Sequence, residues 1–305
     1  MTTAEILKKV RRIEIKTKGL SNHIFAGEYH STFKGRGMSF SEVREYTPGD
    51  DVKFIDWNVT ARFSAPFVKV FEEERELILM LMVDISGSGL FGTQKQAKRD
   101  LIAEMGAVLA FSATTNNDKV GVIFFSNKIE KYVPPKKGKG HILHIIRELI
   151  ALEPDPSKPV PVSKSVKSGH EGVTEHTDVG LALEFLNNVM KKRSIAFLLS
   201  DFVSNPYEQA LQLAARKHDL IGIHIYDKYD KEMPPAGLVQ VMDAESGQMF
   251  WLDTNDKGVK LQYAKAYDER NKYCIHSFRK SGASLLHVRT DEDYVKVLQS
   301  YFKGR

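Results

Sequence analysis

The sequence predicts an α/β fold in which helices flank a doubly wound, mostly parallel sheet. Three observations indicate this fold class. The run LILMLMV at 77–83 is continuously apolar, as expected for a strand buried on both faces of a parallel sheet. Strand-like and helix-like segments alternate after it, which implies crossover connections. Polar clusters stand at predicted strand ends or helix starts, near the sheet edge where ligands of such folds bind.

Two regions are expected: an N-terminal extension over 1–76 and the α/β domain over 77–305. Residues 2–19 predict a short amphipathic helix, and the rest of the extension is irregular or β-rich. In the domain, the apolar spacing predicts helices at 94–114, 141–152, 179–192, 207–218, 259–281 and 291–302. Short apolar segments predict further strands at 120–125, 129–133, 194–200, 220–226, 238–242, 249–252 and 284–288.

One segment interrupts this alternation. Residues 154–172, PDPSKPVPVSKSVKSGHEG, are rich in Pro, Ser and Lys and offer little that could join a core. We expect an exposed, mobile loop there.

Composition and charge narrow the function classes. The net charge of +5 is scattered, and its densest cluster, on the predicted N-terminal helix, is typical of a solvated helix face. No nucleic-acid recognition motif accompanies it, so no nucleic-acid partner is expected, although nucleic-acid binding stays an alternative. The one cysteine, Cys274, excludes an intrachain disulfide and fits a reducing compartment. No apolar run approaches the roughly 20 residues of a membrane helix, and we expect a cytoplasmic protein, with peripheral attachment to the inner membrane through partners as the alternative.

Oxygen-bearing side chains cluster at three predicted strand ends or helix starts. Asp84, Ser86 and Ser88 follow the strand at 77–83, Thr177 precedes a helix, and Asp201 follows the strand at 194–200. Hard divalent cations take oxygen ligands, so we expect one Mg²⁺ or Mn²⁺ at this sheet edge. Two carboxylates among neutral hydroxyls leave the ion free to take a further carboxylate from a partner protein.

Each of these residues also has an ordinary structural interpretation. Asp and Ser are common in turns, Thr177 could cap a helix, and Asp178 could stabilise its first turn. The metal hypothesis rests on their occurring together and in this order.

Three short segments resemble a known metal site. DISGS at 84–88, HTDVGLAL at 176–183 and FLLSDF at 197–202 resemble the metal-ion-dependent adhesion site of von Willebrand factor A domains. The resemblance implies a von Willebrand factor A-like fold, Mg²⁺ at Asp84, Ser86, Ser88, Thr177 and Asp201, and a partner that supplies an acidic side chain.

The segment FKGRGMSFSEVREYTPGDDVKFIDWNVTARF at 33–63 resembles the bacterial family called domain of unknown function 58, with Lys53 where an Arg is expected. That resemblance implies a companion of a MoxR-type AAA+ ATPase, in a chaperone-like or complex-maturation role. The charged residues of this segment predict a salt-bridge network more readily than an active site. A partner-binding surface is the other interpretation, and it would comprise Arg44, Asp50, Asp51, Asp56, Trp57 and Arg62.

The expected function is therefore a metal-dependent protein-interaction module. No enzyme is expected, because the sequence contains neither G-x-S-x-G nor the phosphate-binding G-x-x-x-x-G-K-[ST]. A metal-dependent phosphoester hydrolase, with the ion as Lewis acid, is the alternative.

Overall fold

The computed structural model describes most of the chain. The described residues are 38–63, 65–73, 77–87, 97–115, 118–151, 177–242 and 249–303. The chain divides into a main unit, Met1–Tyr29 with Leu77–Arg305, and a small unit, His30–Glu76. The predicted helix at 2–19 and the loop expected at 154–172 lie outside the described residues.

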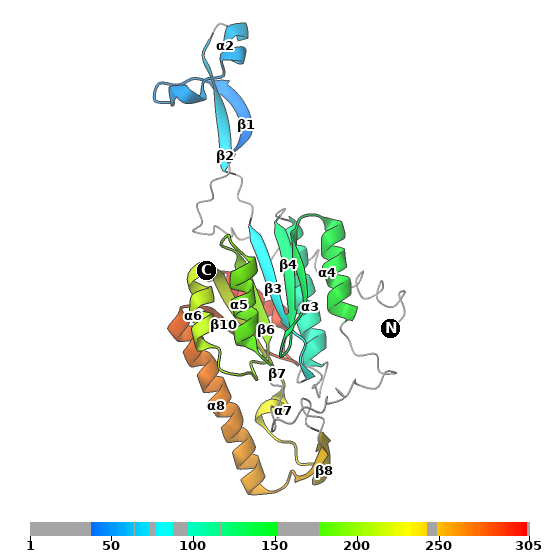
Figure 1. Cartoon of the computed structure of the whole chain (residues 1–305). Helices are drawn as coiled ribbons and strands as arrows, with labels where there is room; N and C mark the ends of the chain where they lie inside the picture. Colours follow the sequence, from blue (N-terminus) through cyan, green and yellow to red (C-terminus); the bar gives the residue numbers. More distant parts are fainter. Residues whose placement is uncertain are drawn as a thin grey trace, which may run out of the picture. The chain divides into compact units, whose positions relative to one another are not determined.

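A six-stranded sheet forms the centre of the main unit (Figure 1). Its strand order is β10-β7-β6-β3-β4-β5, and neighbouring strands are parallel except for β5, which is antiparallel to β4. The strands are β3 (Ile78–Asp84), β4 (Lys119–Phe125), β5 (Ile129–Lys136), β6 (Ile195–Ser200), β7 (Asp219–Tyr226) and β10 (Ser284–Arg289).

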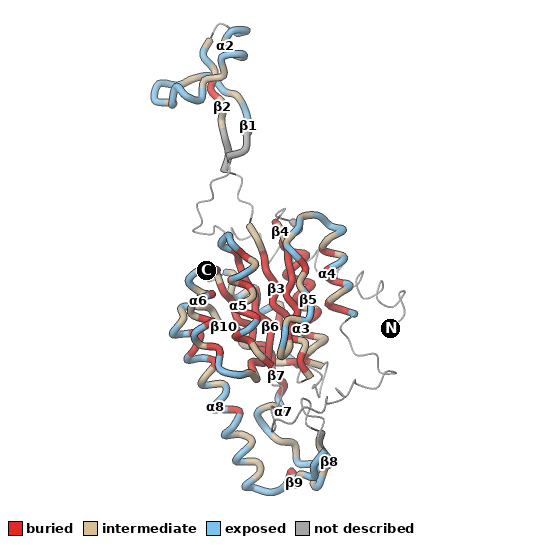
Figure 2. The backbone as a smooth tube through the Cα atoms, viewed as in Figure 1, coloured by how far each residue is buried: buried red, intermediate tan, exposed pale blue. Residues whose placement is uncertain are grey.

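Helices cover both faces of this sheet, which confirms the expected fold class. The described helices of the main unit are α3 (Lys98–Thr115), α4 (Lys139–Ala151), α5 (Val179–Val189), α6 (Glu208–Lys217), the short α7 (Lys228–Lys231), which does not contribute to either core, α8 (Lys257–Ser281) and α9 (Tyr294–Lys303). Alternate residues of β3 divide between two cores: Leu81 packs with α3, α4 and α9, while Met82 packs with α5, α6 and α8. Figure 2 shows the resulting buried strands between less buried helices.

The chain runs through the sheet in two directions from β3. It adds β4 and β5 on one side and later β6, β7 and β10 on the other. In open α/β sheets this reversal leaves a crevice beyond the carboxyl ends of the two central strands. Asp84, the last residue of β3, and Asp201, which follows β6, therefore lie at the same sheet edge.

A second, smaller sheet in the main unit is the hairpin β8 (Leu238–Met242) and β9 (Met249–Asp253). Its two strands match the predicted positions closely. Several of its large apolar side chains are exposed, and Trp251 is 65% exposed.

The small unit is an antiparallel pair of strands with two short helices between them. It comprises β1 (Met38–Glu45), η1 (Val52–Phe54), α2 (Trp57–Phe63) and β2 (Phe67–Glu73). Among its described side chains, Val68 is the buried apolar one, while Val52, Trp57 and Phe63 are well exposed.

Candidate metal centre

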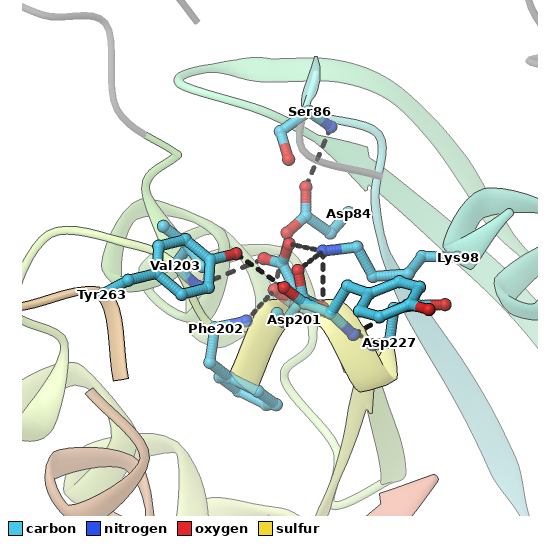
Figure 3. Close-up of polar contacts among 11 residues, drawn as sticks. Asp84, Ser86, Lys98, Asp201, Phe202, Val203, Asp227 and Tyr263 are labelled. Carbon is cyan, nitrogen blue, oxygen red and sulfur yellow. Dashed lines mark hydrogen bonds and ion pairs between the residues drawn. The ribbon is translucent and has the colours of Figure 1, made fainter. Parts of the chain in front are cut away.

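Asp84 is the best-defined member of the predicted metal set. It ends β3 and is 4% exposed. Its Oδ1 accepts a hydrogen bond from the backbone N–H of Ser86 at 2.9 Å, and its Oδ2 accepts one from the Ser200 hydroxyl at 2.5 Å (Figure 3). These two bonds fix the carboxylate at the crevice between β3 and β6.

The surroundings of Asp84 disfavour its negative charge. Burial, together with the nearby charge of Asp201, raises the pKa of Asp84 to about 6, although hydrogen bonds from Ser200 and Ser86 act in the opposite direction. A cation placed against this carboxylate would therefore relieve an unfavourable electrostatic situation.

Asp201 lies one residue beyond β6 in a tightly held loop. Its Oδ1 accepts a hydrogen bond from the backbone N–H of Val203 at 3.2 Å, and the backbone N–H of Phe202 donates to the Ser200 hydroxyl at 2.9 Å. Phe202 has a φ of 55°, an uncommon value for a residue other than glycine. Its ring is buried and packs edge-on against Phe278, with the ring centroids 5.3 Å apart. This packing supports the sharp turn that carries Asp201.

The second oxygen of Asp201 meets a buried cation that the sequence analysis did not anticipate. Lys98 Nζ lies 2.9 Å from Asp201 Oδ2 and 3.3 Å from the carboxylate of Asp230 (Figure 3). Burial acts to lower the pKa of Lys98, but the two carboxylates outweigh it and hold that pKa above its ordinary value. Lys98 is therefore charged at neutral pH.

Thr177 lies just before α5 and is 1% exposed. Its backbone carbonyl accepts hydrogen bonds from the Ser204 hydroxyl at 2.8 Å and from the Asn205 N–H at 3.2 Å. The next residue, Asp178, donates its N–H to the carbonyl of Ser126, which follows β4. Thr177 is thus tied to the segments that follow β6 and β4, at the same sheet edge as Asp84 and Asp201.

The Thr177 hydroxyl has no hydrogen-bond partner within the described part of the chain. Buried polar atoms are nearly always paired, and an ion or a water molecule could satisfy this hydroxyl. The helix-cap interpretation does not account for it, because Asp178 is the N-cap and accepts the N–H of Leu181 at 2.8 Å.

The residues at this edge fit a hard divalent cation. Asp84 and Asp201 supply carboxylates, and Ser86 and Thr177 supply hydroxyl groups, which are the ligand types such ions take. Ser88 lies outside the described residues. Within the described ranges no three His, Cys, Asp or Glu side chains form a metal-binding cluster, so the candidate site depends on its hydroxyl groups.

Lys98 and Asp230 are functional candidates that sequence reasoning missed, whereas Ser200 stands in the predicted polar cluster with Asp201 but outside the expected ligand set. Ser200 directly precedes Asp201, and that adjacency was the one available signal. Lys98 and Asp230 are 132 residues apart and meet only through the fold.

A glycine-rich sequence pattern follows β3 and includes Ser88. Residues 87–92, GSGLFG, have the G-x-G-x-x-G spacing of dinucleotide-binding loops. In those loops the motif opens a helix and an acid ends the next strand. Here β4 is followed by Ser126 and not by an acid, so the acidic residue of that motif is missing. Residues 88–92 of the pattern lie outside the described residues.

The charged residues of the upstream segment hold their own unit together. Arg44 forms a bidentate salt bridge with Asp50, with N–O distances of 2.8 and 2.7 Å. The hydrogen bond from Arg44 is the main reason that the pKa of Asp50 lies well below its ordinary value. Asp51 caps η1 and Asp56 caps α2. Trp57, by contrast, is 68% exposed.

Solved structures with a similar arrangement include the VWA domain of SpRpn10, at a TM-score of 0.36 and 14% identity over 73% of this chain and 94% of that one. An aerotolerance-related membrane protein from Bacteroides fragilis matches with a TM-score of 0.47 and 13% identity, over 75% of this chain and all of that one. A neighbour from Vibrio fischeri is also described as membrane-spanning. The cytoplasmic location expected from the sequence is contradicted by these descriptions and is withdrawn. In the described ranges, no helix has the length and apolar character required to span a membrane.

Sequence relatives are found among bacteria. An uncharacterized protein of Mycobacterium tuberculosis is 28% identical over 97% of this chain and 88% of its own length. The uncharacterized protein YeaD of Bacillus subtilis is 28% identical over 39% of this chain and 28% of its own length. The model of the family described as protein of unknown function DUF58 matches residues 42–273, which include residues 42–76 of the small unit and the candidate metal centre, and the chain belongs to this family.

Proposed function

We propose that this chain is a protein-interaction module whose docking depends on one divalent cation. Mg²⁺ or Mn²⁺ would be held by Asp84, Ser86, Ser88, Thr177 and Asp201. The observation that carries the proposal is the buried hydroxyl of Thr177, which has no hydrogen-bond partner among the described residues and lies at the same sheet edge as two aspartates.

The electrostatics of the site support the same proposal. Asp84 is buried and lies close to Asp201. Its burial and the negative charge of Asp201 both disfavour the ionised form of Asp84. A bound dication would offset the repulsion between the two carboxylates. Hydroxyl ligands would leave the ion electron-poor, so that it attracts an additional carboxylate.

The partner would be a protein that contributes that carboxylate. Family membership and the resemblance of the upstream segment favour a MoxR-type AAA+ ATPase, and the role would be chaperone-like or in the maturation of a complex. An acidic side chain entering an open coordination position would replace a water molecule there and gain a strong charge-assisted contact.

Ion binding is tested by calorimetric titration of the full chain with MgCl₂ and with MnCl₂. The wild type should bind one ion, and Asp84→Ala should show no binding heat. Asp268→Asn, which removes an exposed carboxylate on α8, is the matched control and should bind like the wild type. Equal binding by Asp84→Ala and the wild type would refute the metal assignment.

Docking is tested by capture of the co-expressed MoxR-type ATPase on the immobilised chain. Capture should be lost in chelator and restored by excess Mg²⁺ for the wild type but not for Asp84→Ala. A complex that survives chelator would place the docking surface elsewhere, with the exposed Trp57 region as the next candidate.

A further inference from the structure

A buried lysine lies at the centre of the acidic edge of the sheet. Lys98 is the first residue of α3, and its side chain is 3% exposed. Lysine is almost never buried to this degree unless it is paired. Here the ammonium contacts Asp201 at 2.9 Å and Asp230 at 3.3 Å, so it joins a candidate metal ligand to an acid outside the predicted ligand set.

Asp230 is itself held in a fixed frame. Its Oδ2 accepts the backbone N–H of Asp227 at 2.7 Å, which forms one half of a capping box around α7. Asp227 in turn accepts a hydrogen bond from the Thr290 hydroxyl at 2.6 Å, and the Tyr263 hydroxyl donates to the Tyr229 carbonyl at 2.7 Å. The frame joins α7 to α8 and to the end of β10, and it therefore fixes where the lysine ammonium lies.

Among the described residues, acidic side chains outnumber basic ones at this edge of the sheet. Three carboxylates gather there, on Asp84, Asp201 and Asp230, and Lys98 contacts two of them directly. The positive charge of Arg99 interacts favourably with Asp84. The guanidinium of Arg99 donates its hydrogen bond to the Ile85 carbonyl, at 2.6 Å. A bound dication would add positive charge to this acidic cluster.

We propose that Lys98 is an internal counter-ion of the metal centre: its ammonium holds Asp201 and Asp230 in place without the metal ion and keeps the affinity for the divalent cation low. The proposal rests on the metal centre proposed above. It gives Lys98 a positioning role, since the lysine acts on the ion through Asp201.

The physical argument has two parts. Without Lys98, two largely buried carboxylates would face each other with no shared cation, and the folded chain would be less stable until a metal ion took its place. With Lys98 present, an incoming dication would share Asp201 with the fixed positive charge of the lysine ammonium. Coulomb repulsion between two cations that share one carboxylate, in a partly desolvated site, is strong enough to change affinity by about ten-fold or more.

The test compares Mg²⁺ affinity and thermal unfolding for Lys98→Met, Asp230→Asn and the wild type, all as full chains. Lys98→Met should bind Mg²⁺ about ten-fold more tightly or better, whereas Asp230→Asn should bind it several-fold more weakly, because the lysine then pairs with Asp201 alone. In chelator, Lys98→Met should have a lower melting temperature than the wild type. Mg²⁺ should raise the melting temperature of Lys98→Met by more than it raises that of the wild type.

A matched surface variant and a charge-balanced pair complete the test. Lys265→Met removes an exposed lysine of α8 that forms an ion pair with Glu269 at 3.8 Å, and it should behave like the wild type in both assays. If Lys98→Met does not fold in chelator, Lys98→Met with Asp230→Asn removes one charge of each sign and should bind Mg²⁺ about ten-fold more tightly than Asp230→Asn.

The two proposals fail in different ways. Equal Mg²⁺ binding by Asp84→Ala and the wild type would overturn the metal centre and the role of Lys98 with it. If Asp84→Ala loses Mg²⁺ binding as expected but Lys98→Met binds Mg²⁺ as tightly as the wild type or more weakly, the role of Lys98 alone would be overturned. A stability loss in Lys98→Met that Mg²⁺ does not reverse would reduce the lysine to a structural residue.

Discussion

Two salt bridges in this chain join the same kinds of group in opposite surroundings. Arg44 and Asp50 are six residues apart and partly exposed, with 43% and 20% of their side chains accessible. Lys98 and Asp201 are 103 residues apart, with only 3% and 6% accessible. The first pair orders a turn that its own sequence already favours. The second pair joins the start of α3 to the loop that follows β6, and it brings together the side chains of the candidate site.

The difference teaches that charge alone does not identify a functional cluster. The upstream segment is rich in acids and bases, yet Arg44, Asp50, Asp51 and Asp56 are engaged in caps and in a local salt bridge. At the sheet edge, burial raises the free-energy cost of each charge, so the loss of a charged partner has a larger effect on stability.

The largest effect is expected from breaking the buried pair. Lys98→Met in chelator should lower the free energy of unfolding of the main unit by about 3–5 kcal/mol, because it leaves two largely buried carboxylates without their cation. Arg44→Met should leave the unfolding of the main unit unchanged, since its pair lies in the small unit and is partly exposed. Urea unfolding followed by far-UV circular dichroism measures both variants. Equal losses would show that burial does not distinguish the pairs.

The next effect concerns pH. The folded pKa of Asp84 is raised to about 6, so the folded state holds this proton more tightly than the unfolded state does. The stability contributed by Asp84 is therefore fully present below the unfolded pKa of about 4 and is lost as pH rises through 6, by up to about 3 kcal/mol. Asp84→Asn should remove this component, which is measured as the difference between the two chains in chelator at pH 4.5 and 7.5. Matching pH profiles for the two chains would contradict the raised pKa.

A smaller effect on stability, with a larger effect on binding, is expected at Thr177. Thr177→Val replaces a buried hydroxyl that has no partner among the described residues by a methyl group of similar size, so stability should stay within about 1 kcal/mol or rise. Mg²⁺ binding should nevertheless weaken by about ten-fold, which corresponds to about 1.4 kcal/mol. Thr177→Ser keeps the hydroxyl and is the control in the same titration. If Thr177→Val binds like the wild type, the hydroxyl is not a ligand.

The smallest effect on stability is expected at Trp57. Its side chain is 68% exposed, so Trp57→Ala should change the unfolding free energy of the main unit by less than about 0.5 kcal/mol. Capture of the ATPase should fall less than it does for Thr177→Val. A greater loss for Trp57→Ala would move the principal docking surface to the small unit.

The fold could be predicted largely from local patterns. The apolar run of β3 marks a strand buried on both faces, and the segments predicted around it lie within a few residues of the observed strands and helices. The four-residue helix α7 escaped prediction, because its capping box involves only Asp227 and Asp230 and lacks an apolar periodicity. The strands of the small unit have mixed composition and were predicted only as an irregular or β-rich region.

The site was predictable only in part, for a physical reason. Asp84, Ser86, Thr177 and Asp201 stand beside strand ends or a helix start, and the fold rule brings such positions to one edge. The pairing of Lys98 with Asp201 and Asp230 depends on side-chain geometry across three elements that sequence spacing does not encode. The metal ligands remain a prediction.

The two tryptophans of the chain, Trp57 and Trp251, give it an unusual optical property. One lies in the small unit and the other on the β8–β9 hairpin, and both are largely exposed. Intrinsic fluorescence should therefore shift little when the main unit unfolds and strongly when a partner covers either surface. Replacing Trp57 by Phe leaves Trp251 as a reporter of the hairpin, and the reverse replacement reports on the small unit. The native chain thus contains one spectroscopic probe for each of its two units, without any attached dye.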